Sequence, residues 1–171
     1  MTRILVMSIV SLGALLFAAN PHSKEWREMA AGMRSQTEPH TRAHAKGKTT
    51  VHSSDAKPYD QAEGLSLIEI NISETFTGDI DGESTVRSLK FQRADKSASQ
   101  VSMQRFSGKL GGRQGTFVLQ GSENVENGKI KATWFVVPGS GTGGLSGLRG
   151  EGGFEGGSGK GSDVWLDYWF E

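Results

Sequence analysis

Apolar and polar residues alternate along most of the chain beyond residue 47, with the two-residue period of β-strands. In one such stretch Ile68, Ile70 and Ile72 occupy one face, and the residues between them are polar. Successive side chains of a strand point to opposite faces, so this pattern indicates a strand with one buried face. Glycine-containing turns separate the stretches. The pattern predicts eight strands, over residues 48–54, 65–76, 83–93, 99–109, 113–121, 129–137, 144–154 and 163–170.

A repeated corner supports this set of strands. The segment FTGDIDG, Phe76 to Gly82, returns as FSGKLGG, Phe106 to Gly112. Each copy ends a strand with an aromatic residue and turns through glycines, as in an up-and-down meander. An open sheet would leave two unpaired edges, whereas closure removes them. We therefore predict an all-β fold, an eight-stranded antiparallel closed barrel preceded by a short N-terminal leader.

Glycine crowds the segment between residues 139 and 161, which contains the run PGSGTGG. Glycine is expensive to order and is expected where the chain turns tightly or another backbone approaches closely. The run resembles a phosphate-binding loop, but no helix is predicted after it, so we expect turns instead. The predicted structural turn residues are Gly78, Gly82, Gly108, Gly112, Pro138, Gly139, Gly141 and Gly143.

The first 46 residues differ in character from the rest. Residues 1–19 combine Arg3 with an apolar run shorter than the roughly 20 residues of a bilayer span, which predicts a signal peptide and an exported protein, periplasmic or secreted. Cleavage after Ala19 would place Phe17 where a small residue is preferred, so an uncleaved N-terminal anchor, the one predicted membrane contact, stays open. Residues 20–46 predict a short leader helix and a flexible linker, and residues 47–171 the barrel domain.

Composition removes several classes of chemistry. The chain has no cysteine, which excludes disulfides and thiolate sites. Its 19 Lys and Arg residues balance 19 Asp and Glu residues, so we predict no nucleic-acid partner. The four histidines, His22, His40, His44 and His52, all precede residue 53, which argues against a Ser-His-Asp site. His40 and His44 would chelate a metal only on a helix, which Pro39 disfavours. We predict no metal and no cofactor.

Six segments carry a family resemblance: Lys57-Pro58-Tyr59 and residues 74–83, 105–119, 137–143, 145–150 and 166–171. On these segments residues 47–171 resemble the bacterial domain of unknown function 3224 family, whose fold is similar to the allene oxide cyclase barrel. The resemblance implies a barrel with a pocket. It implies no reaction, because a fold does not fix a function.

Candidate site residues follow from the strand pattern and from the resemblance. Glu74 shares a face with the three isoleucines, and the resemblance places Arg105 beside the second corner. Both could enter a mostly apolar lumen, together with Phe76 and Tyr168. An eight-stranded barrel either fills its lumen or holds one small ligand. We predict binding of a small, largely apolar molecule anchored by Glu74 and Arg105. A structural ion pair between these two residues is the alternative.

Two further functions stay open. One is an isomerase or cyclase of the allene oxide cyclase kind with Glu74 as acid or base, although no catalytic residue of those enzymes carries over to this chain, so an enzyme is not the first prediction. The other is a structural or interaction barrel with a filled core. Aromatic residues on both faces of two predicted strands indicate a homo-oligomer interface or a core beneath a loop: Trp134, Phe135, Trp165, Tyr168, Trp169 and Phe170.

Overall fold

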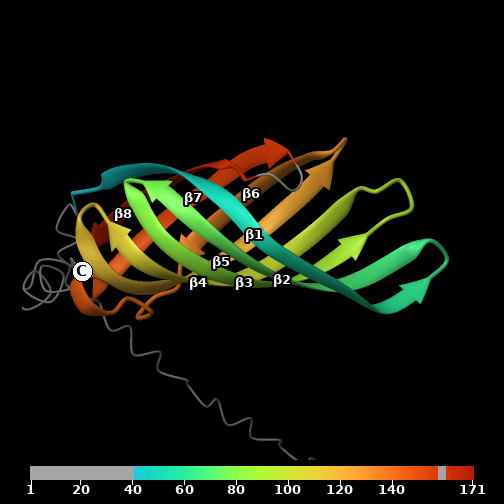
Figure 1. Cartoon of the computed structure of the whole chain (residues 1–171), viewed down its shortest axis with the longest axis horizontal. Helices are drawn as coiled ribbons and strands as arrows, with labels where there is room; N and C mark the ends of the chain where they lie inside the picture. The colour runs from blue at the N-terminus through green and yellow to red at the C-terminus, as the bar shows by residue number, and fades with distance from the viewer. Residues whose placement is uncertain (1–40, 158–160) are drawn as a thin grey trace, which may run out of the picture. The chain divides into compact units, whose positions relative to one another are not determined.

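A computed structural model describes residues 41–157 and 161–171. Eight antiparallel strands follow one another in chain order, and the first also pairs with the last, so the sheet closes into a ring (Figure 1). This confirms the predicted all-β, eight-stranded closed arrangement. The strands are β1 Ala43–Ala62, β2 Leu65–Gly78, β3 Ile80–Gln92, β4 Ala98–Leu110, β5 Arg113–Glu126, β6 Lys129–Val136, β7 Leu148–Gly157 and β8 Asp163–Phe170, with a 3-10 turn η1 at Gly143–Leu145.

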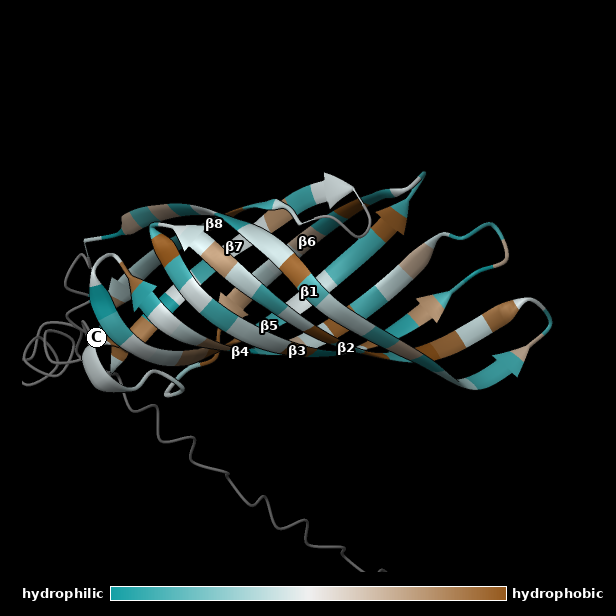
Figure 2. Ribbon diagram, viewed as in Figure 1, coloured by the Kyte–Doolittle hydropathy of each residue, from teal (hydrophilic) through white to brown (hydrophobic). Residues whose placement is uncertain are grey.

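The predicted signal or anchor at residues 1–19 and the leader helix lie outside the described residues. Within the described ranges, no helix is long and apolar enough to cross a membrane. Along the strands, hydrophilic and hydrophobic residues alternate as the sequence pattern predicts (Figure 2).

Strand β1 is much longer than the predicted strand over residues 48–54. Residues 43–46, which were predicted to be linker, pair with β8 and belong to the sheet. At its other end β1 continues beside β2 through Pro58, which lies at a shift in register where a residue without a backbone N–H is tolerated. The polar sequence of these segments lacks a periodic apolar face of its own. Its strand conformation comes from pairing with β8 and β2.

One end of the ring is filled by side chains. This packed end contains the turns between β2 and β3 and between β4 and β5, and its centre is three phenylalanines in contact. The ring of Phe106 lies 5.6 Å from that of Phe76, edge on, and 4.8 Å from that of Phe117. Leu145, carried by η1, is fully buried against them. Phe76 is therefore a core residue, and the loop before β7 contributes to the core.

Two predicted turn glycines allow a close approach at this end. Gly82 and Gly108 lie opposite each other on β3 and β4. A Cβ atom on Gly82 would lie 2.7 Å from the Cα atom of Gly108, and one on Gly108 would lie 2.9 Å from the Phe106 ring. The strands can therefore pack beneath that ring only without side chains at these positions.

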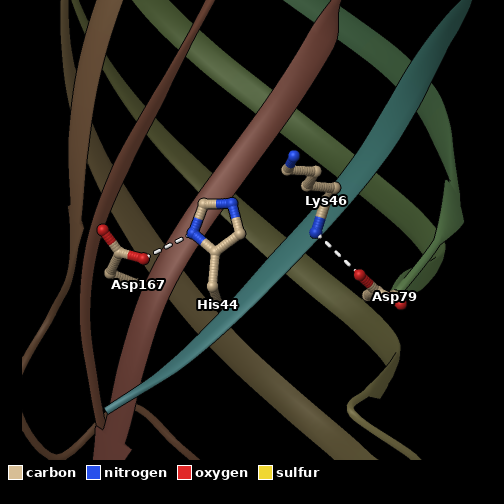
Figure 3. Close-up of polar contacts among 4 residues, drawn as sticks. All are labelled: His44, Lys46, Asp79 and Asp167. Carbon is tan, nitrogen blue, oxygen red and sulfur yellow. Dashed lines mark hydrogen bonds and ion pairs between the residues drawn. The ribbon is translucent and has the colours of Figure 1, made fainter.

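Strand β1 is joined by polar contacts to β8 and to the turn between β2 and β3 (Figure 3). His44 Nδ1 lies 2.6 Å from Asp167 Oδ1. The Lys46 amide donates to Asp79 Oδ2 at 3.0 Å, and the Asp79 amide donates to the Lys46 carbonyl at 2.8 Å. His44, considered above with His40 as a metal ligand, thus contacts a carboxylate on the neighbouring strand, while His40 lies outside the described residues.

Candidate functional site

Beyond the phenylalanine core, the interior of the ring holds a cavity of about 330 Å³. Its wall is mainly apolar, and Ile70, Ile72, Val86 and Ile130 are among the residues that form it. The volume is near the lower end of the roughly 300–1,000 Å³ range of small-molecule pockets. Polar residues also line this wall, and most of them lie on β2 to β5: Glu74, Lys90, Gln100, Gln104 and Glu123.

Glu74 of β2 faces this cavity, on the side that the sequence pattern predicts. Its Oε1 atom accepts hydrogen bonds from Gln104 Nε2 at 2.6 Å and from Ser84 Oγ at 3.1 Å. Burial raises the pKa of Glu74, the two hydrogen bonds partly offset that rise, and the negative charge of Glu123 adds to it. Glu74 is thus a mostly buried acid whose ionised form is disfavoured.

A second buried carboxyl, Glu123 of β5, lines the same cavity. Gln100 Nε2 donates to its Oε2 atom at 2.7 Å, and Ser102 Oγ donates to its Oε1 atom at 3.0 Å. Burial raises the pKa of Glu123, and the hydrogen bond from Ser102 partly offsets that rise. The interior therefore contains two acids of the same kind, each held by an amide and a hydroxyl.

The donors that hold both acids come largely from one strand. Gln100, Ser102 and Gln104 alternate along β4 and are all buried on its inner face. Lys90 of β3 lies directly opposite Gln100 and also lines the cavity. Together with the two acids and Ser84, these four residues form what we call the acid site: Glu74, Ser84, Lys90, Gln100, Ser102, Gln104 and Glu123.

Arg105 does not reach the cavity, which corrects the predicted anchor. Its neighbours Gln104 and Phe106 are buried, so the alternation of the strand turns Arg105 to the outer face, where it is exposed. It lies there in a surface groove that His52 and Glu83 also line. Among the described residues no ion pair joins Arg105 to Glu74, so the predicted alternative of a structural ion pair is also wrong.

The other two predicted lumen residues lie at the packed end. Phe76 belongs to the core, and Tyr168 packs against that core with its ring 6.0 Å from the ring of Phe170. Neither contributes to the described lining of the cavity. Sequence reasoning missed Glu123 because the predicted strand ended at Gly121, whereas β5 continues to Glu126.

The aromatic residues of β6 and β8 divide between the two faces. Trp134 is inside and lines the cavity, where its ring lies 5.4 Å from that of Phe154. Phe135 and Trp165 are outside and each is 40% exposed. Exposed apolar residues of β3 and β4 share the outer face, and we call this set the outer patch: Leu89, Val101, Met103, Phe135 and Trp165. A homo-oligomer interface at this patch stays a prediction.

Comparison with known proteins identifies relatives without an assigned activity. Residues 45–168 match the model of a family described as protein of unknown function (DUF3224). A crystal structure of a DUF3224 protein of unknown function from Shewanella oneidensis MR-1 is similar, with a TM-score of 0.61 and 29% sequence identity, over 76% of this chain and 98% of that one. No curated protein matches the chain. The resemblance to allene oxide cyclase stays a prediction.

Proposed function

The chain belongs to the DUF3224 family of proteins of unknown function, and on that premise we propose that it binds a small, largely apolar molecule in the interior cavity. The observation that carries this proposal is the placing of two hydrogen-bonded carboxyls in the wall of a mainly apolar cavity. A buried carboxylate is costly, and apolar residues of the same size would stabilise the fold better. Polar groups in such a place orient a ligand.

A neutral apolar dye, N-phenyl-1-naphthylamine, tests this proposal through its fluorescence. We expect saturable binding with one dye per chain. Val86→Trp would fill the cavity and abolish binding, whereas Leu89→Trp, on the outer face of the same strand, would preserve it. Equal dye binding by the wild-type protein and both variants, or no saturable binding to any of them, would contradict the proposal.

Export completes the proposal, with residues 1–19 as the signal. Native mass spectrometry of protein purified from its own host would report both the mature N-terminus and any retained small molecule. An N-terminus at Met1 on a protein free of membrane and retained inside the cell would contradict export.

The raised pKa values of Glu74 and Glu123 favour a second candidate, acid-base isomerisation of the bound molecule. Here Glu74→Gln would remove turnover of a retained molecule while N-phenyl-1-naphthylamine still binds. Unchanged turnover in that variant would exclude Glu74 as the acid or base.

A further inference from the structure

We propose that the molecule held in the cavity is an apolar amine, bound as its ammonium ion by the carboxylates of Glu74 and Glu123. This inference rests on the proposed function and names the ligand class. Three properties of the acid site support it: the hydrogen-bonding capacity that remains, the charge of the wall, and the aromatic rings beside it.

The amide and hydroxyl donors of the acid site are already directed at its own acceptors. Gln104 Nε2 donates to Glu74 and also lies 2.8 Å from Ser84 Oγ, and Ser84 Oγ donates to Glu74. Gln100 and Ser102 donate to Glu123. A carboxylate accepts about four hydrogen bonds, so both acids keep free acceptor positions, and no partner is seen for Glu74 Oε2 among the described residues. A ligand head group that approaches these two acids must therefore donate.

Among ligand head groups that can donate hydrogen bonds, the charge of the cavity wall favours a cation. When both acids are ionised, Glu74 and Glu123 contribute two negative charges and Lys90 one positive charge, which leaves one negative charge uncompensated. A neutral alcohol would supply a hydrogen bond but leave that charge buried. An anionic head group would approach Lys90 and be repelled by both carboxylates. An ammonium ion compensates the charge and supplies up to three donors.

The cavity wall also offers aromatic rings. Trp134 and Phe154 both line it, with ring centroids 5.4 Å apart and planes inclined at 47°. The indole Nε1 atom of Trp134 is buried against Gly152 with no hydrogen-bond partner in the part of the chain that the structure describes, so the indole offers the cavity no accessible donor. An aromatic face attracts an ammonium ion within about 6 Å. A wall that combines carboxylates with aromatic rings therefore suits an alkylammonium ligand better than it suits an alcohol or a carboxylate ligand.

Isothermal titration of the full chain near neutral pH with three probes of equal chain length tests the inference: octylammonium chloride, octan-1-ol and sodium octanoate. We expect octylammonium to bind about tenfold or more tightly than octanol, since charged hydrogen bonds contribute more than neutral ones, and octanoate to bind most weakly. Glu74→Gln and Glu123→Gln should each weaken octylammonium about tenfold and leave octanol within about threefold. Glu83→Gln, on the exposed face of β3, is the matched control and should change none of the three.

Equal binding of the three probes, or tightest binding of octanoate, would overturn the amine inference and leave the apolar-ligand proposal standing. The inference would also fall if Glu83→Gln weakened octylammonium as much as Glu74→Gln does, because the effect would then arise at the surface. Failure of all three probes and of N-phenyl-1-naphthylamine would overturn the proposed function itself.

Discussion

Replacing Glu74 or Glu123 by glutamine should remove a pH-dependent loss of stability from the empty protein. Burial raises the pKa of both carboxyls above their ordinary value of 4.5. Glutamine has nearly the same shape but does not ionise. Its one carbonyl oxygen can accept both hydrogen bonds that Glu74 Oε1 accepts, whereas at position 123 its amide nitrogen replaces one of the two accepting oxygens. We therefore expect the free energy of unfolding of the wild-type protein to fall, relative to either variant, as the pH rises above 4.5.

The sign and size follow from proton binding. Between the unfolded pKa of about 4.5 and the raised pKa of the folded state, the folded protein keeps a proton that the unfolded chain has lost. The stabilising contribution is thus complete below the unfolded pKa and is lost as the pH rises through the folded pKa. Within that window each carboxyl removes up to about 1.4 kcal/mol per pH unit, a large amount against the roughly 5–15 kcal/mol stability of a domain.

Urea unfolding at a series of pH values, from below 4.5 to neutral, would measure the difference between wild type and variant. Glu83→Gln reports what the loss of an exposed charge does by itself. Because the charge of Glu123 raises the pKa of Glu74, each single variant already removes the repulsion between the two charges, so the double variant should gain less stability than the sum of the single variants. A wild-type-minus-variant difference that stays constant across the series, as for Glu83→Gln, would refute the reasoning.

Three further predictions concern other parts of the ring. Phe106→Ala, at the centre of the packed end, should lower the free energy of unfolding by about 3–5 kcal/mol in urea, and Phe91→Ala, a partly exposed position, by clearly less; equal losses would contradict the assignment of the core. Phe135→Ser with Trp165→Ser should shift the protein to monomer in sedimentation velocity, and a wild type that is monomeric at every concentration would exclude the homo-oligomer. Arg105→Ala should leave dye binding unchanged, and loss of binding would return Arg105 to the site.

The sequence pattern predicts those features that depend on local alternation and turns. These include the eight strands, their order and the inward face of Glu74. Strand ends are predicted less well, because they depend on partners far away in the chain. Residues 43–46 become strand through β8, and residues 122–126 through β4 and β6. Glu123 was missed for this reason, since its inward position depends on an extension that no local apolar pattern indicates.

The prediction that Arg105 faces the lumen is wrong for a different reason, because the sequence repeat itself contains the information that corrects it. The offset that relates Phe76 to Phe106 also relates Glu74 to Gln104. Both phenylalanines are buried in the same core, so residues two positions before them must face inward too. The repeated corner therefore predicts the pair Glu74 and Gln104, whose side chains are hydrogen bonded at 2.6 Å. The adjacent arginine has the opposite orientation for the same reason.

The two ends of the ring make opposite contributions to stability, and this distinguishes a binding role from a structural one for Glu74. The phenylalanine core stabilises the ring, while ionised carboxylates in the cavity destabilise it until a cation compensates them. If Glu74 serves a ligand, Glu74→Gln makes the empty protein more stable at neutral pH and weakens octylammonium. If Glu74 only fixes strand register through Ser84 and Gln104, the same substitution leaves octylammonium binding unaffected, although it still removes the pH-dependent loss of stability that burial causes. Octylammonium binding by this one variant therefore distinguishes the two roles.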